Sequence, residues 1–280
     1  YSPSSEIVAA KTGSPLVVGR GNGELFVASD ATGILKHTKK VLFLKDNEMV
    51  ILGKDLQLIS LPNGKKQKLV FEPIDWKIED VDRGSFPHFM IKEIYEQPRI
   101  IRNIAQNYAD QVGTLTKLIE NAQGTFFIGA GTAFHACLAG SYLFSKIAHR
   151  HVNTTVASEF NYLEDFLNEK SLIIALSQSG ETIDVVEPLQ RAKQKASKIV
   201  AITNALGSTI YRMADYKVLL GAGPEKAVAS TKAYIAKLAI MLILTFSITK
   251  NTSRGKELLL EAAKEIDKLS KQGKNVVVIA

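Results

Sequence analysis

The second part of this 280-residue chain alternates short apolar runs with segments of helical periodicity. Five runs have the length and the residue types of buried strands, namely "TFFIGAG", "NTTVAS", "SLIIALS", "KIVAIT" and "YKVLLGA". Helical patterns fill the spaces between them, and two further helices are expected at residues 230–250 and 255–272. Such alternation is typical of a parallel sheet covered by helices on both faces. It predicts an α/β fold with a doubly wound parallel sheet.

In the first 74 residues, short β segments alternate with turns. Six β-rich segments stand in this part: "PLVVG", "ELFVAS", "KKVLFL", "EMVIL", "LQLISL" and "KLVFEPI". The turn-forming stretches "GNG", "KDN", "GKD" and "PNG" separate several of them. We therefore expect an antiparallel β region without helices, which belongs to something larger.

Three other segments define the organisation of the chain. Residues 75–84 ("DWKIEDVDRG") break the β pattern and are expected to connect the two parts. Residues 88–122 are helical, and Pro98 marks a kink or the start of a new helix. Residues 275–280 ("NVVVIA") form either a last parallel strand or a strand that opens a further domain. We expect the chain to be truncated at both ends.

The composition, with 46% hydrophobic and 22% charged residues, is that of an ordinary globular protein. The net charge of +7 comes from scattered basic residues, without a basic patch interleaved with aromatic residues. We therefore expect a lysine-rich surface and no nucleic-acid partner. The apolar run at residues 238–248, just after Lys237, is shorter than the roughly 18 residues of a membrane span. It predicts a buried core helix and no membrane partner.

The single cysteine of the chain, Cys137, bears on its compartment. One cysteine excludes an intrachain disulfide framework and a multi-cysteine zinc site. The first residues, "YSPSSEIVAAK", lack the basic and apolar pattern of a signal peptide. These features indicate an intracellular, reducing compartment, and we expect a cytoplasmic protein.

The stretch "SQSGET", residues 177–182, lies between a predicted strand and a predicted helix. In open α/β sheets, ligands bind at such junctions, where a helix N-terminus offers free N–H groups and the positive end of its dipole. Ser177, Ser179 and Thr182 supply hydroxyl donors and Gln178 an amide, so the stretch suits a phosphate group without needing a lysine or arginine. The alternative is that Ser179 or Thr182 merely caps the helix.

A second loop of this kind occurs in "FIGAGTAFHA", residues 127–136. Its glycines resemble a dinucleotide fingerprint, but Phe134 stands where the third glycine belongs, so a nicotinamide site is not expected. Gly129, Gly131 and Thr132 instead suit the close approach of another ligand.

A third loop, in "GPEKAVASTKAY", leads into the long apolar helix. Ser230 and Thr231 are expected to cap this helix. Lys232 in its first turn opposes the helix dipole, which indicates a functional role. Because the three loops follow parallel strands, we expect them to converge on one edge of the sheet.

The three motifs together resemble a known family. "SQSGET", "VASTKAY" and "GAGT" are similar to the sugar isomerase (SIS) domain, a phosphosugar-binding α/β fold. "HFMIKEIYEQP" resembles the linker of the glutamine–fructose-6-phosphate aminotransferases (isomerising), or glucosamine-6-phosphate synthases. "GSPLVVGRGNGELFVASD" resembles the end of their N-terminal-nucleophile glutaminase domain.

The resemblance implies a division of the chain into four parts. Residues 1–75 would be the C-terminal part of the glutaminase domain, 76–100 the interdomain linker, 101–252 the first SIS domain, and 253–280 a connecting helix with the first strand of a truncated second SIS domain.

The resemblance also implies an activity, the glutamine-dependent amination and isomerisation of fructose 6-phosphate to glucosamine 6-phosphate. Either sugar phosphate would be a ligand, and glutamine would act through the missing glutaminase region. A homodimer is implied, and neither a cofactor nor a metal. This chain alone is expected to be inactive, since the family's glutaminase nucleophile and second SIS domain are absent from it.

The substrate-binding positions that the resemblance carries over are Thr132, Ser177, Gln178, Ser179, Thr182, Val228 and Ser230. Ala133 and Ala130 depart from the family pattern, which has serine and cysteine there, and the serine hydroxyl is one phosphate contact. No catalytic residue is assigned. His135, His149 and His151 are not assigned catalytic roles, His135 is expected to have a packing role, and Cys137 is expected to be a small buried apolar residue.

Two alternative functions remain open. One is a SIS-domain isomerase or deaminase that acts on amino-sugar phosphates, which would not need the β-rich first part. The other is a non-catalytic phosphosugar-binding module. Regulators of that type join a SIS domain to a helix-turn-helix, and no helix is predicted in residues 1–75.

Overall fold

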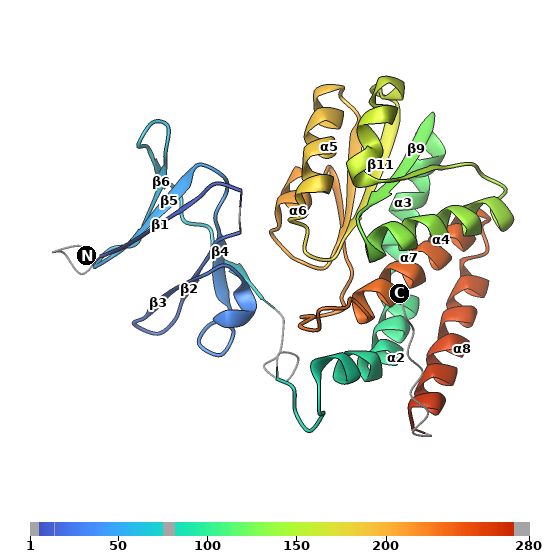
Figure 1. The fold of residues 1–280 in the computed structure, drawn as a ribbon, viewed down its shortest axis with the longest axis horizontal. Coiled ribbons are helices and arrows are strands. Elements are labelled where there is room, and N and C mark those ends of the chain that lie inside the picture. Colours follow the sequence, from blue (N-terminus) through green and yellow to red (C-terminus); the bar gives the residue numbers. More distant parts are fainter. Residues whose placement is uncertain (1–5, 14, 75–81, 272–280) are drawn as a thin grey trace. The chain divides into compact units, whose positions relative to one another are not determined.

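A computed structural model describes residues 6–13, 15–74 and 82–271 (Figure 1). The chain forms two compact units, the first made of residues 1–84 with 207–209 and the second of residues 85–206 with 210–280. The predictions for residues 75–81 and for the strand at 275–280 lie outside the described residues. Within the described ranges, no helix combines the length and the apolar character needed to cross a membrane.

The described residues of the first unit form two antiparallel sheets, as predicted. One sheet has the order β1-β5-β6-β7, with β1 Ile7–Lys11, β5 Glu48–Leu52, β6 Gln57–Ser60 and β7 Lys66–Gln67. The other has the order β3-β2-β4-β8, with β3 Leu25–Ala28, β2 Val17–Arg20, β4 Lys40–Phe43 and β8 Glu72–Pro73.

The period-two pattern of these strands explains why the sheets pack together. Val18 and Leu42 point into a core that includes Val50 of β5, whereas their neighbours Val17 and Val41 belong to a second core. The sheet β3-β2-β4-β8 is therefore buried on both faces at its centre.

Three details of the first unit differ from the sequence prediction. Strands β1 and β7 are not predicted by the sequence, the segment "KLVFEPI" is paired only at β8, and a 3-10 turn, η1 Ala31–Gly33, interrupts the β region. The carboxylate of Asp30 accepts the Thr32 N–H at 2.6 Å and so begins this turn. Both β1 and η1 lack a strong local pattern, because β1 ends in the lysine of "IVAAK" and η1 spans three residues.

The second unit is built on a parallel sheet with the order β10-β9-β11-β12-β13. The strands are β9 Gly124–Gly129, β10 Asn153–Val156, β11 Ser171–Ser177, β12 Lys198–Thr203 and β13 Tyr216–Leu219. All neighbouring pairs are parallel. The five predicted strands are thus confirmed.

Helices cover both faces of this sheet, which confirms the doubly wound α/β fold (Figure 1). They are α3 Ala109–Asn121, α4 Thr132–Lys146 and α7 Lys232–Ile248 on one face, and η2 Ala157–Phe166, α5 Ile183–Gln194 and α6 Thr209–Met213 on the other. Along β11, Leu172, Ile174 and Leu176 pack on the first face, and Ile173 and Ala175 on the second. A strand buried on both sides must be a continuous apolar run, which is the pattern of "SLIIALS".

Two long helices, α2 Phe89–Asn107 and α8 Thr252–Lys271, lie side by side in Figure 1 and extend the core of the first face. Of the two alternatives for Pro98, the start of a new helix is wrong, because α2 runs through this residue and the helix breaks at Tyr108 instead. Pro98 removes only one backbone hydrogen bond, and its ring is buried in the packed helix. The Tyr108 hydroxyl donates to the Leu219 carbonyl oxygen at 2.7 Å, a contact from a distant strand that holds the break.

Helix α8 contributes Leu259 and Ala263 to the same core as α2 and α7. The compact units divide at residues 84 and 85, and the predicted boundaries at residues 75, 100 and 252 stay predictions.

Gly129, at the end of β9, allows the chain to turn directly into α4. A Cβ atom at this position would lie 2.8 Å from the Ala133 carbonyl carbon and 2.9 Å from the Phe134 nitrogen. Because these are backbone atoms, they can move away only if the start of α4 moves with them.

We predict that Gly129→Ala lowers the free energy of unfolding by about 1–3 kcal/mol, the usual range for overpacking a well-packed site. Gly113→Ala is the matched control, since Gly113 lies in helix α3 and nothing would lie within 4 Å of its Cβ. The control should be neutral or stabilise the protein by roughly 0.5–1 kcal/mol. Urea unfolding of both variants tests this, and equal stabilities would contradict it.

Candidate functional site

The order of the parallel sheet brings two of the predicted loops together. Strand β10 follows β9 in the chain but pairs on its outer side, so β9 and β11 are neighbours at the centre of the sheet. The chain thus leaves the ends of β9 and β11 in opposite directions, which opens a crevice between them. The loops at 129–132 and 177–182 stand at this switch point, where open α/β sheets bind ligands.

A pocket of about 110 Å³ lies between these two loops. It is lined by Ala130, Thr132, Ala133, Leu176, Ser177, Gln178, Ser179, Thr182, Val185 and Lys237. Five of the seven predicted substrate-binding residues are therefore brought together. The volume is well below the roughly 300–1,000 Å³ of pockets that enclose a whole small molecule, so it suits one group such as a phosphate.

The loop after β11 is shaped by its own serines. The Ser177 Oγ accepts the Gly180 N–H at 2.9 Å, and the Ser179 Oγ accepts the Glu181 N–H at 3.2 Å. Gly180 takes a positive φ of 67°, which a side chain would oppose. A hydroxyl that accepts a hydrogen bond keeps its own O–H for donation. The serines can therefore hold the loop and still donate to an anion in the pocket.

The alternative that these residues cap helix α5 is wrong. Thr182 occupies the N-cap position, but its side chain makes no capping hydrogen bond. The Val185 and Val186 N–H groups instead donate to the backbone oxygen of Thr182, at 3.0 Å each. The Ser179 hydroxyl bonds within the loop and does not reach the helix. The Thr182 hydroxyl, 3.5 Å from that of Ser179, is thus not engaged in capping.

The loop after β9 contributes backbone geometry and one hydroxyl. Gly131, with a φ of 55°, precedes α4 and makes no side-chain cap, and Thr132 opens the helix. Ala133 lines the pocket with a methyl group. The pocket therefore lacks, at this position, the hydroxyl that the family's serine would supply.

Lys237 of α7 is a pocket residue that the sequence analysis did not identify. Its side chain is completely buried, and its Nζ has no hydrogen-bond partner among the described residues. Desolvation lowers the pKa of Lys237 to about 8, while Glu225 and Cys137 act in the opposite direction. The available signal was a lysine inside an apolar helix, since lysines are rarely fully buried without a partner.

The third loop, at residues 220–231, does not place its predicted residues in the pocket. Val228 is fully exposed, and the Ser230 hydroxyl donates to the Glu225 Oε2 at 2.9 Å. Neither residue lines the pocket described above.

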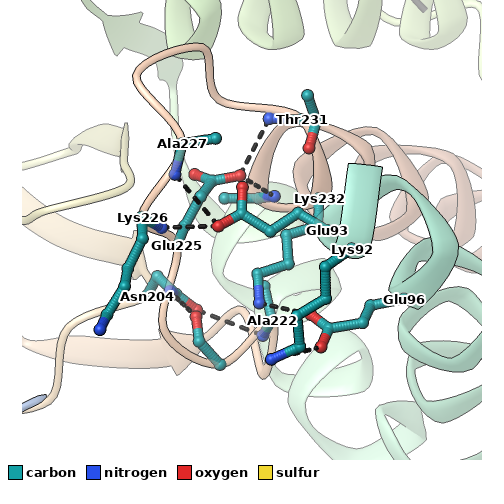
Figure 2. Close-up of polar contacts among 12 residues, drawn as sticks. Lys92, Glu93, Glu96, Asn204, Ala222, Glu225, Lys226, Ala227, Thr231 and Lys232 are labelled. Carbon is teal, nitrogen blue, oxygen red and sulfur yellow. Dashed lines mark hydrogen bonds and ion pairs between the residues drawn. The ribbon is translucent and has the colours of Figure 1, made fainter. Parts of the chain in front are cut away.

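The prediction that Ser230 and Thr231 cap α7 is also wrong. Thr231 is the N-cap residue, but its side chain makes no capping bond. The Glu225 Oε1 accepts the N–H groups of Thr231 and Ala233 instead, at 2.9 and 3.2 Å (Figure 2). A carboxylate at this point also complements the helix dipole.

Helix α2 holds the other end of this loop. The Glu93 Oε1 accepts the N–H groups of Lys226 and Ala227, at 2.6 and 3.1 Å, as Figure 2 shows. Burial raises the pKa of Glu93, although these backbone hydrogen bonds oppose the shift. Lys232, which the sequence suggested to be functional, is buried and donates to the Glu96 Oε2 at 2.7 Å. Its role in the structure is an ion pair between α7 and α2.

Two further predictions concern residues near the pocket. Cys137 is fully buried in α4, as predicted, and desolvation raises the pKa of its thiol, which keeps it neutral. The packing role predicted for His135 is wrong, because this residue is exposed, and it is not among the residues that line the pocket.

Comparison with known proteins identifies relatives of both units. A family model described as SIS domain matches residues 118–264. The chain is 42% identical over 274 residues to the glutamine–fructose-6-phosphate aminotransferase (isomerising) of Caldanaerobacter subterraneus subsp. tengcongensis, which covers 94% of this chain and 45% of that protein. The corresponding enzyme of Geobacillus kaustophilus is 41% identical over 266 residues, 93% of this chain and 44% of that protein.

A solved structure supports the same relationship. The C-terminal domain of glucosamine-fructose-6-phosphate aminotransferase from Francisella tularensis matches with a TM-score of 0.56 and 28% identity, over 68% of this chain and 56% of that one. The resemblance inferred from the motifs is confirmed. The chain spans less than half the length of the two aminotransferases named above.

We predict that Lys237→Met raises the free energy of unfolding at pH 7 by about 3 kcal/mol, since a pKa lowered from 10.5 to about 8 corresponds to roughly 1.4 kcal/mol per unit. Below pH 8 the amine is charged in both states, and the folded state carries the cost of burying it. Between pH 8 and 10.5 the folded state releases the proton first, so the wild type gains stability and the difference shrinks.

Urea unfolding at pH 7, 8.5 and 9.5 measures this difference. Lys264→Met, on the exposed side of α8, is the control and should leave stability almost unchanged. Equal stabilities of wild type and Lys237→Met at pH 7 would show that the buried amine carries no uncompensated charge.

Proposed function

Since the chain belongs to the SIS domain family, we propose that it is the phosphosugar-binding part of a glutamine–fructose-6-phosphate aminotransferase (isomerising). That enzyme would aminate and isomerise fructose 6-phosphate to glucosamine 6-phosphate at the expense of glutamine. The observation that carries the proposal is the pocket at the switch point of the sheet, because it gathers hydroxyl and amide donors at the start of α5.

In this proposal the phosphate of the sugar occupies the pocket. The hydroxyls of Ser177, Ser179 and Thr182 and the amide of Gln178 donate to its oxygens, with Thr132 on the opposite side. The N-terminus of α5 adds the positive end of its dipole. These groups are neutral, so they would bind the phosphate dianion through hydrogen bonds and the helix dipole rather than through a positive charge.

The pocket is too small for the whole sugar, so the hexose would extend out of it. We place Val228 and Ser230 along this part of the ligand. Their loop is held to the same edge of the sheet by Asn204, which follows β12. Its side chain accepts the Ala222 N–H at 3.2 Å and donates to the Gly223 carbonyl at 2.6 Å (Figure 2).

We assign no catalytic residue to this chain, and the proposal requires neither a metal nor a cofactor. Residues 1–75 would belong to the glutaminase domain, 76–100 to the linker, 101–252 to the first SIS domain and 253–280 to the connection with a second one. The greater length of the related aminotransferases supports this division. The glutaminase chemistry and the sugar chemistry would then depend on regions outside this chain.

We propose a cytoplasmic homodimer. The single buried cysteine suits a reducing compartment, and two exposed aromatic side chains of η2, Tyr162 and Phe166, suit a protein interface. Light scattering should then give twice the 30.6 kDa mass of the chain. A mass that stays at that of one chain over the micromolar range would contradict the dimer.

The phosphate site predicts that the chain binds fructose 6-phosphate and not fructose in calorimetric titrations. Ser179→Asp should weaken the binding of fructose 6-phosphate at least about ten-fold, because a carboxylate beside the phosphate adds repulsion between like charges. Ser253→Asp, on exposed α8, introduces the same charge away from the pocket and should have no effect. Fructose binding as tight as that of its phosphate, or an unaffected Ser179→Asp, would contradict the assignment.

A further inference from the structure

The amine of Lys237 is placed to meet a ligand. Its side chain comes from α7 and lines the same pocket as the loops after β9 and β11. It is fully buried, and its Nζ makes no hydrogen bond to any described residue. A buried ammonium group without a partner is strongly disfavoured, so a structural role alone gives no reason for a charge here.

Two ionisable groups, Glu225 and Cys137, shift the pKa of Lys237, but neither accepts a hydrogen bond from its amine. Glu225 lies in the loop before α7, and its oxygens accept hydrogen bonds from Ser230, Thr231 and Ala233. Cys137 projects from α4 as a buried neutral thiol. The residues that the loops after β9 and β11 contribute to the pocket do not ionise. The N–H groups of the Lys237 amine are therefore available to donate hydrogen bonds to a ligand in the pocket.

The other buried lysine of α7, Lys232, has a structural role and differs from Lys237 in having a counter-ion. Lys232 is equally buried, and its Nζ contacts the Glu96 carboxylate at 2.7 Å. The same helix thus holds one lysine with an internal counter-ion and one without. The difference between them lies in the pocket beside Lys237.

We propose that Lys237 is the charged anchor of the phosphate site, with its Nζ donating to a phosphate oxygen of the bound sugar. The inference rests on the proposed phosphosugar function and adds a residue to it. The amine would supply the positive charge that the hydroxyl donors lack. It would also supply a donor in a pocket where Ala133 provides only a methyl group.

A charged anchor has a consequence for proton binding that a packing residue lacks. The free protein holds Lys237 at a pKa of about 8, so the amine is about half charged at pH 8. A phosphate dianion beside it favours the charged form, and the phosphomonoester itself, with a pKa near 6, stays doubly charged. Binding at pH 8 should therefore be accompanied by proton uptake.

The test is calorimetric titration of the full chain with fructose 6-phosphate at pH 8, in two buffers of different ionisation enthalpy. The wild type and the exposed control Lys264→Met should take up protons on binding. Lys237→Met should take up none, and its Kd should be at least about ten-fold higher. Urea unfolding of each variant verifies that it is folded.

The outcomes separate the two proposals. If Lys237→Met is folded and binds as tightly as the wild type, without a change in proton uptake, the role of Lys237 is wrong and the phosphosugar function stands. If the wild type binds inorganic phosphate in a Lys237-dependent way but not fructose 6-phosphate, the anchor stands and the substrate class is wrong. If the wild type binds neither compound, both proposals fail.

Discussion

The pairing of β9 with β11 at the centre of the parallel sheet is the interaction on which the second unit depends. Residues from Ser171 to Ala175 are in register with residues from Gly124 to Ile128, and both strands are buried by helices on either side. This pairing aligns the carboxyl ends of two strands that are separated in the chain by β10. Two loops that are about 50 residues apart thereby form one pocket beside the N-terminus of α5, a position that suits an anion.

The buried charges of this unit are concentrated around the start of α7. The buried Glu93 and the half-buried Glu225 and Glu96 meet backbone N–H groups or a lysine, and each of these contacts compensates part of the cost of removing charge from water. Lys237 is the contrast, since its amine meets no hydrogen-bonding group among the described residues. A protein that keeps such a charge gives up stability at that position. Binding sites commonly show this exchange of stability for affinity.

The loop at residues 220–231 shows how a distant segment positions a site. Carboxylates hold it from two sides, Glu93 from α2 and Glu225 from the loop itself, while Asn204 ties it to the end of β12. Glu93 lies within the segment 76–100 that resembles an interdomain linker. The part of this segment that contains Glu93 therefore belongs to the packed framework of the loop, whereas Val228 stays exposed.

The sequence by itself determined the two rhythms of strands, the doubly wound fold and five residues of the pocket, because strand periodicity, turn residues and the serines of "SQSGET" are local signals. Tertiary structure alone decided the rest. The break of the helix at Tyr108, the capping of α7 by Glu225 and the Glu93 contacts depend on side chains meeting backbone that no periodicity predicts. Lys237 is the clearest case. The sequence shows a lysine in an apolar helix. Whether a counter-ion lies beside this lysine depends on how the surrounding elements pack.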